Sequence, residues 1–219
     1  MSATRLKQMT IAVLLGGTSS EREVSLLSGR TVSDALRGRG YRVRDVDPAD
    51  ADWMAQLDDV GFAFIALHGP GGEDGTLQGA LEALGIPYTG SGVLGSALAM
   101  DKRVAKILFE RTGVLTPPWR VISAANSSPH GSWGDSPAFP DDIDLSGARQ
   151  AALDLGGYPV VVKPNDQGST VGLTVVGDES ELAQALSLAG RYSSRILMEA
   201  FIPGRELTVA VLGTEALPV

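Results

Sequence analysis

The stretch TIAVLLGGTSSEREVSLLSG, from Thr10 to Gly29, combines three signals that together decide the fold class. A short apolar run predicts a buried strand, and the pair Gly16 and Gly17 predicts a tight turn. Ser20 and Glu23 have the spacing of a capping box, which predicts that a helix begins here. Apolar residues then recur at helical spacing, namely Val24, Leu27, Val32, Ala35 and Leu36. A strand, a glycine turn and a helix in this order are typical of an open α/β sheet.

The following residues repeat this order of elements. YRVRDVD at 41–47 and FAFIALHG at 62–69 predict two further strands, and TLQGALEALG at 76–85 predicts a second helix. A second glycine-rich turn, HGPGGEDG at 68–75, again joins a strand to a helix. Open α/β sheets bind ligands outside the carboxyl ends of their strands, so we expect both glycine turns to lie along one edge of a single cleft. We place a first domain at residues 1–95.

The remainder of the chain alternates helices and strands, which predicts a second α/β unit. A helical stretch at 93–113 ends at Gly113, and a segment rich in Ser, Pro, Gly and Asp follows at about 123–146. We assign no chemistry to that surface excursion, which contains Trp133 and Phe139. We expect a central domain at 96–199 and the start of a third domain at 200–219. The predicted helices are 146–157 and 179–190, and the predicted strands are 158–164, 173–176, 195–202 and 206–213.

Composition limits the classes of function. The chain has 219 residues, 43% of them apolar and 20% charged, which is typical of a soluble globular protein with a sizeable core. It has no cysteine and two histidines, so disulfides and cysteine-based metal sites are excluded. The net charge of -8 disfavours nucleic acid and anionic membranes as partners. Since no apolar run reaches the length of a signal or membrane segment, we expect a cytoplasmic protein that binds small molecules.

The stretch VVVKPNDQGSTVG at 160–172 contains the most informative chemical pattern. Lys163 ends an apolar strand, where a buried ammonium is costly unless an anion meets it. Gly168, Ser169 and Thr170 follow in a loop whose backbone N–H groups and hydroxyls suit a phosphate. The spacing is not that of a Walker A motif, because the lysine precedes the glycines. An anion site and a strand-end lysine that reaches solvent are both compatible with this pattern.

Two glutamates flank a short connection near the end of the chain. In ILMEAFIPGRELTV at 196–209, Glu199 ends an apolar strand and Glu206 begins the next predicted strand. The residues between them, AFIPGR at 200–205, form a connection short enough for a backbone hinge. Carboxylates on both sides of a hinge suit amino groups and sugar hydroxyls, but ordinary charges at a sheet edge give the same pattern.

Together these stretches resemble the D-alanine-D-alanine ligases, which are members of the ATP-grasp superfamily. The resemblance rests on four ordered motifs, at 14–29, 65–102, 158–172 and 196–213, and spans Ile11 to Gly213 except for about 123–147. It implies an N-terminal open α/β (pre-ATP-grasp) domain followed by an incomplete α+β ATP-grasp fold. The implied activity is the ATP-dependent joining of two D-alanines through a D-alanyl phosphate, for peptidoglycan precursors, with magnesium on the nucleotide.

The resemblance also implies which residues bind ATP. Two lysines would hold its phosphates, a glycine-rich loop would cover them, a hinge would receive the adenine, and a carboxylate would bind the ribose. The lysines would be Lys102 and Lys163, and the loop residues would be Gly168, Ser169 and Thr170. The hinge would be formed by Glu199, Ala200, Phe201 and Ile202, and the ribose-binding carboxylate would be that of Glu206. For Lys102 and the loop, a helix-surface lysine and a plain turn are the alternatives.

The pocket for the first D-alanine is implied in the same way. Glu21 and Ser169 match residues that position this substrate, and His68 matches a histidine that lines its pocket. A carboxylate at Glu21 would hold the ammonium group while the substrate carboxylate is phosphorylated. We interpret Glu23 as the capping-box partner of Ser20. A first-turn helix acid at Glu21 and a structural histidine at His68 explain these two residues without the family.

The family's chain continues for roughly another hundred residues, the size of a small domain. The resemblance places the magnesium ligands, a catalytic arginine and a tyrosine loop beyond Val219, so we expect no metal ligands here and predict that the 219-residue chain alone is inactive. The family suggests a homodimer. Three alternatives remain open: a D-alanyl-D-lactate or D-alanyl-D-serine ligase, a non-catalytic ATP-grasp nucleotide-binding module, and a Rossmann dehydrogenase, for which the G-x-G-x-x-G spacing is missing.

Overall fold

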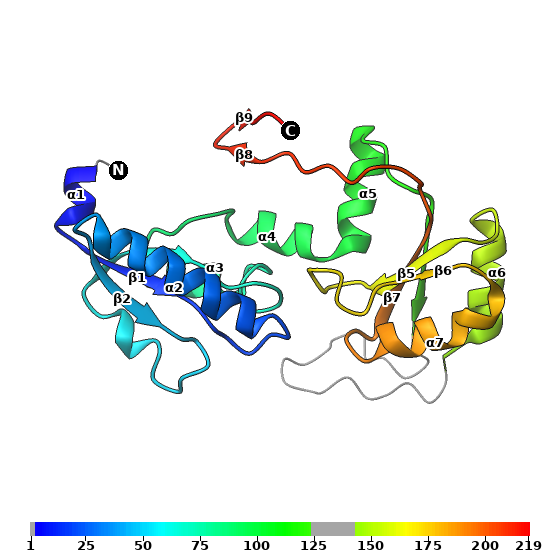
Figure 1. Cartoon of the computed structure of the whole chain (residues 1–219), viewed down its shortest axis with the longest axis horizontal. Coiled ribbons are helices and arrows are strands. Elements are labelled where there is room, and N and C mark those ends of the chain that lie inside the picture. The colour runs from blue at the N-terminus through cyan, green and yellow to red at the C-terminus, as the bar shows by residue number, and fades with distance from the viewer. Residues whose placement is uncertain (1–2, 124–142) are drawn as a thin grey trace.

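The computed structural model describes residues 3–123 and 143–219, which form two lobes with a sheet in each (Figure 1). The sheet of the N-terminal lobe is parallel, with the strand order β2-β1-β3. Its strands are β1 (Thr10–Leu14), β2 (Arg42–Val46) and β3 (Val60–Ile65). The parallel pairing confirms the open α/β sheet that the sequence predicts.

Helices cover both faces of this sheet. Helix α2 (Arg22–Gly38) packs its partly buried Leu26, Val32 and Leu36 against one face. Helix α3 (Thr76–Ala83) places Leu77 and Leu81 in the core on the other face. The remaining short elements of the lobe are α1 (Ala3–Lys7) and the 3-10 turn η1 (Ala55–Leu57).

The buried face of α2 differs from the predicted apolar face. Val24, Leu27 and Ala35 are exposed, and the fully buried positions are Ser25, Gly29 and Ser33. The reason is the close approach of the helix, because a Cβ on Gly29 would lie 2.4 Å from the Cβ of Leu15. Small residues therefore let the start of α2 lie directly against the turn that follows β1.

The capping box predicted at Ser20 and Glu23 is wrong. Glu21 is the residue before α2, and no side chain caps the helix. The Ser19 hydroxyl instead accepts a hydrogen bond from the Glu21 N–H at 3.1 Å and donates to the carbonyl of His68 at 2.8 Å. Glu23 is exposed in the first turn. The bonds of Ser19 join the two glycine-rich turns, which therefore lie side by side at the carboxyl edge of the sheet, as predicted.

The predicted helix at 93–113 is two helices, α4 (Val93–Met100) and α5 (Lys102–Thr112). They meet at Asp101, whose backbone is extended and whose carboxylate accepts from the Val104 N–H at 3.0 Å. An aspartate at an N-cap competes with helix continuation because it satisfies one of the unpaired N–H groups of the next helix. The break makes Lys102 the first residue of α5. Gly113 ends α5 with a left-handed backbone, as predicted.

The central lobe contains an antiparallel sheet in the order β4-β7-β5-β6. Helices α6 and α7 cover one face and share an apolar core with the strands. The opposite face carries Lys163 and Glu199 and lies beside α5. The elements are β4 (Trp119–Ser123), which the sequence did not indicate, α6 (Leu145–Asp154), β5 (Val160–Pro164), β6 (Thr174–Val176), α7 (Glu179–Gly190) and β7 (Arg195–Ala200).

Residues 201–219 leave the central sheet and are exposed throughout (Figure 1). The strand predicted at 206–213 is reduced to β8 (Val211–Leu212), which pairs with β9 (Glu215–Ala216). Apolar alternation does not form a strand unless a neighbour pairs with its backbone, and 206–209 pair with no strand among the described residues. Trp133, Phe139 and most of the excursion at 123–146 lie outside the described residues.

Candidate functional site

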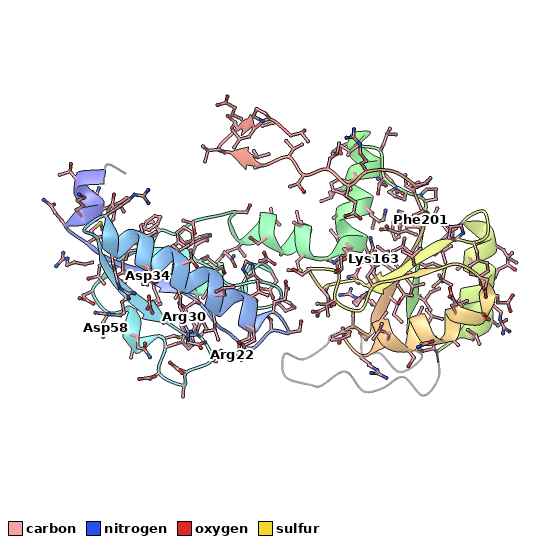
Figure 2. All side chains as sticks on the ribbon, viewed as in Figure 1. Arg22, Arg30, Asp34, Asp58, Lys163 and Phe201 are labelled. Atoms are coloured by element: carbon pink, nitrogen blue, oxygen red, sulfur yellow. The ribbon has the colours of Figure 1, made fainter. Side chains whose placement is uncertain are left out.

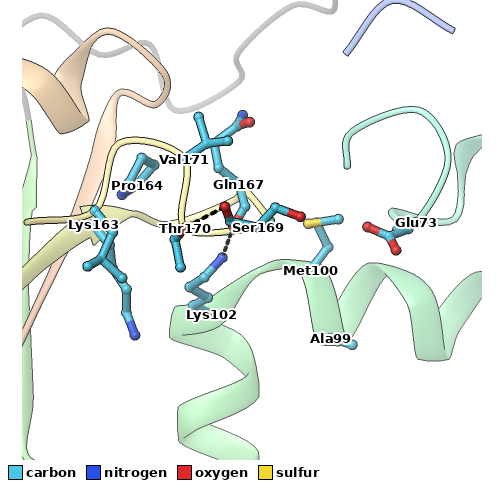
Figure 3. Close-up of a pocket in the computed structure, with 12 residues that line it drawn as sticks. Glu73, Ala99, Met100, Lys102, Lys163, Pro164, Gln167, Ser169, Thr170 and Val171 are labelled. Carbon is cyan, nitrogen blue, oxygen red and sulfur yellow. Dashed lines mark hydrogen bonds between the residues drawn. The ribbon is translucent and has the colours of Figure 1, made fainter. Parts of the chain in front are cut away.

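A cavity of about 500 Å³ opens beside the loop that follows β5 (Figure 3). It brings together five of the predicted nucleotide residues, namely Lys102, Lys163, Gly168, Ser169 and Thr170. Glu73 of the N-terminal lobe and Met100 at the end of α4 also line it. The cavity therefore lies where the two lobes and the α4–α5 break meet.

The loop over this cavity is fixed to the start of α5. The Asn165 carbonyl accepts from the Lys102 N–H at 3.0 Å, and its side-chain oxygen accepts from the Arg103 N–H at 2.9 Å. The Lys102 ammonium donates to the carbonyl of Gln167, as Figure 3 shows. Burial, and next the charge of Lys163, lower the pKa of Lys102 below its ordinary value. Both lysines thus share one weakly solvated region that favours an anion.

The loop itself has an unusual backbone. Ser169 and Thr170 have positive φ angles of 47° and 60°, although neither is a glycine. The Thr170 hydroxyl donates to the Ser169 carbonyl at 2.6 Å. Such left-handed non-glycine residues cluster at ligand-binding loops, where surrounding contacts hold them in place. The conformation keeps the loop folded over the side of the cavity that Lys102 occupies.

Lys163 is paired with Glu199 on the neighbouring strand. Its ammonium lies 2.8 Å from Glu199 Oε2, and the side chain lies beside α5 (Figure 2 and Figure 3). The other carboxylate oxygen, Oε1, lies 3.1 Å from the ammonium of Lys106 on α5. Glu199 is therefore a buried carboxylate with two lysine partners.

Sequence reasoning missed Lys106. It is 4% exposed, and burial lowers its pKa although Glu199 opposes this effect. Its ammonium also donates to the Thr116 hydroxyl at 2.6 Å and to the Pro117 carbonyl at 3.0 Å. The available signal was its position four residues after Lys102, which places both on one side of the helix.

Glu21 is buried, with 5% exposure, and its Oε2 has no hydrogen-bond partner among the described residues. A Cβ on Gly69 would lie 2.5 Å from this oxygen, and a Cβ on Gly168 would lie 3.1 Å from it. The carboxylate thus lies between the second glycine turn and the loop that lines the cavity. Removing an unpaired charge from water is costly, so this oxygen favours a cation supplied by a ligand.

His68 lies in the same turn as Gly69. Its Nε2 is 3.1 Å from the Ser28 hydroxyl, and its Nδ1 is 3.9 Å from Glu73 Oε1. Glu73 lines the cavity, so His68 is connected to the cavity through its contact with Glu73. These contacts hold the ring between Ser28 and Glu73.

The residues of the predicted hinge, Glu199 to Ile202, are not among those that line the cavity. The Ala200 N–H donates to Pro118 at 3.0 Å and the Phe201 N–H donates to Pro159 at 3.3 Å, so both are engaged within the protein. Ile202 is 62% exposed, and Glu206 is exposed within the irregular segment. Among the described residues, the structure therefore brings Glu199 next to Lys163 but leaves Glu206 apart from the lysines.

Comparison with known proteins connects this geometry to a family. The family model described as D-ala D-ala ligase N-terminus matches residues 46–91, and the one described as D-ala D-ala ligase C-terminus matches residues 143–219. The chain belongs to the D-alanine-D-alanine ligase family. The resemblance and the α/β fold with a partial ATP-grasp unit are thereby confirmed.

Relatives and solved structures extend this match. The chain is 44% identical over 215 residues to a D-alanine--D-alanine ligase of Synechococcus sp. and 47% identical over 215 residues to one of Paracidovorax citrulli. These alignments cover 96% and 95% of this chain but 60% and 58% of the relatives. The Bacillus anthracis D-alanine--D-alanine ligase structure complexed with ATP is 34% identical, with a TM-score of 0.70, over 90% of this chain and 60% of that one. The chain thus spans about 60% of the length of these ligases.

Two further features of the structure concern membrane-spanning helices and metal-binding side chains. Within residues 3–123 and 143–219, no helix is both long and apolar enough to cross a bilayer. In the same ranges, no three histidine, aspartate or glutamate side chains come together as a metal-binding group.

Proposed function

We propose that this chain takes part in the ATP-dependent ligation of two D-alanines, through a D-alanyl phosphate, for peptidoglycan precursors. One juxtaposition supports this best: Gly168 lies between the cavity lined by Lys102 and Lys163 and the carboxylate of Glu21, whose Oε2 has no hydrogen-bond partner among the described residues. The carboxylate of Glu21, which favours a cation, lies on one side of the loop at Gly168. Lys102 and Lys163, which favour an anion, lie on the other side. A zwitterionic amino acid and a polyphosphate satisfy both at once.

The nucleotide side of the proposal uses the central lobe. Lys102 and Lys163 bind the ATP phosphates, and the loop Gly168–Thr170 covers them, because its backbone N–H groups and hydroxyls can donate to phosphate oxygens. Glu199 and the hinge residues Ala200, Phe201 and Ile202 receive the adenine. Glu206 binds the ribose, which requires residues 201–206 to close toward the cavity from their exposed positions.

The amino-acid side uses the loop and the N-terminal rim. Glu21 accepts hydrogen bonds from the ammonium of the first D-alanine, while Ser169 and His68 orient this substrate. Its carboxylate oxygen attacks the terminal phosphorus of ATP, which gives D-alanyl phosphate and ADP. The amine of the second D-alanine then attacks the acyl carbon, loses a proton and releases inorganic phosphate. Glu21 assists both steps by holding the ammonium of the first D-alanine, which fixes the orientation of its carboxyl group and then of the acyl phosphate.

Several parts of the proposal rest on the family alone. We infer that magnesium accompanies the ATP phosphates, with ligands beyond Val219, and that the enzyme works as a homodimer in the cytoplasm. D-lactate or D-serine as second substrate, and a non-catalytic nucleotide-binding module, are the alternatives.

The decisive experiment measures phosphate release with ATP and D-alanine, followed by identification of the dipeptide. It compares this chain with the same chain extended by the part of a relative that it does not match. We expect turnover only in the extended protein, because phosphoryl transfer needs positioned charge around the phosphates. Parallel reactions with D-lactate and D-serine test the second substrate. If the extended protein binds ATP but forms no product with any acceptor, the ligase assignment is wrong and the binding module is favoured.

A further inference from the structure

The two lysines bound to Glu199 differ in how firmly they are held. The Lys106 ammonium has three acceptors, at Glu199 Oε1, the Thr116 hydroxyl and the Pro117 carbonyl, which matches its three hydrogens. Its side chain is 6% exposed. Lys106 is therefore saturated with hydrogen bonds and lies outside the cavity lining.

Lys163 is the more accessible partner. Its side chain is 19% exposed, it lines the cavity, and its ammonium donates to Glu199 Oε2 at 2.8 Å. Lys102 lines the same cavity, and the charge of Lys163 is, after burial, one of the causes that lower the pKa of Lys102. A phosphate bound between these two lysines relieves their repulsion, which favours exchange of Glu199 for a phosphate as the partner of Lys163.

This exchange has a cost at Glu199. The carboxylate is 8% exposed, so water replaces Lys163 poorly, and a buried charge that loses its partner is strongly destabilised. A second lysine that stays in place removes most of this cost. With both lysines present, the three groups carry a net charge of +1, and the pair of Lys106 and Glu199 remains neutral after Lys163 has moved.

We propose that Lys106 is a positioning residue that holds Glu199 as a fixed counterion and so lets Lys163 leave this carboxylate for a nucleotide phosphate. The inference rests on the proposed ATP site. It explains why a lysine lies beneath the hinge rather than in the cavity. It also predicts that Lys106 matters for phosphate binding, although it contacts no phosphate.

The test compares the affinities for ATP and for adenosine, which lacks phosphates, by competition against a fluorescent ATP analogue. Lys106→Gln keeps a donor for Pro117 but removes the charge. We expect its ATP-to-adenosine affinity ratio to fall about tenfold, because Lys163 then stays with Glu199. Lys106→Arg should keep the ratio within about threefold, since its charge remains. Lys7→Gln removes an equal charge at a remote, exposed position and should change nothing.

A second background separates charge exchange from simple support of the fold. In Glu199→Gln there is no charge to balance, so adding Lys106→Gln should change the ratio by less than about threefold. If Lys106→Gln weakens ATP and adenosine equally, or weakens ATP as much in the Glu199→Gln background, the inference is wrong.

Two further outcomes keep the test decisive. If Lys106→Gln does not fold, Glu199→Gln alone carries the test: it releases Lys163, so the ratio should rise by about threefold or more, and an unchanged or lower ratio overturns the inference. If the wild-type chain binds no ATP, the proposed nucleotide site fails, and this inference fails with it. A wild type that binds ATP without these differences refutes Lys106 alone.

Discussion

The N-terminal and central lobes each bury one glutamate near the cavity, in opposite electrostatic surroundings. Glu199 contacts two ammonium groups, whereas Oε2 of Glu21 has no partner among the described residues. Both are less than 10% exposed, so burial does not distinguish them. The difference indicates that lysines of the protein itself compensate the charge of Glu199, whereas Glu21 favours a cation supplied by a ligand. Changes at the two sites should therefore affect different ligands.

The largest expected effect is on ATP binding, at the Lys163 partner of Glu199. Lys163→Ala should weaken ATP binding about 100-fold, because it removes a charged ligand of the phosphates. D-alanine binding should change less than about twofold, since Lys163 does not face Glu21. Calorimetry with each ligand measures both, and Lys7→Ala is the control for the loss of a lysine. Unchanged ATP affinity would remove Lys163 from the nucleotide site.

A smaller effect is expected on D-alanine binding, at Glu21. Glu21→Gln should weaken D-alanine binding about 20-fold, because it replaces a charge-assisted hydrogen bond with a neutral one. ATP binding without D-alanine should stay the same. Glu23→Gln is the matched control, since Glu23 lies two residues further along the same helix start but is exposed. If both variants bind D-alanine like the wild type, the ligand-facing role of Glu21 is refuted.

The smallest expected effect is a pH dependence. The pKa of Lys102 is lowered by burial first and by the charge of Lys163 next, so Lys102 loses its proton below the ordinary lysine value of 10.5. A lysine attracts phosphate only when protonated, so ATP affinity should fall about threefold as the pH rises from about 8 to about 10. Lys102→Arg should flatten this fall, because arginine stays charged. A wild-type affinity that is constant across this range contradicts the assignment.

The parts of the fold that the sequence predicted well depend on local signals. The strand from Thr10 and the helix end at Gly38 follow from β-branched residues and from glycine, which act over a few residues. The apolar face of α2 was wrong because Gly29 packs onto Leu15, and sequence periodicity carries no information about such a close approach. The helix break at Asp101 was missed for a related reason, since an aspartate is equally compatible with a helix surface.

The candidate site divides in the same way. The family resemblance predicted that Lys102, Lys163 and Glu21 bind charged groups, and the structure brings the two lysines to one cavity. Lys106 could not be predicted, because its role depends on the antiparallel pairing of β5 with β7, which brings Glu199 to the face beside α5. The strand predicted at 206–213 failed since strand formation needs a partner as well as a pattern.

By itself, the sequence determined most of the order of strands and helices, the two glycine-rich turns and the family, because these depend on residue type and spacing along the chain. Only the tertiary structure decided which charges compensate one another. It gave Glu199 two lysines and left Oε2 of Glu21 without a partner among the described residues, although both residues are buried glutamates. The physical reason is that the cost of a buried charge depends on which groups the fold brings within a few ångströms, and contacts between distant segments decide that.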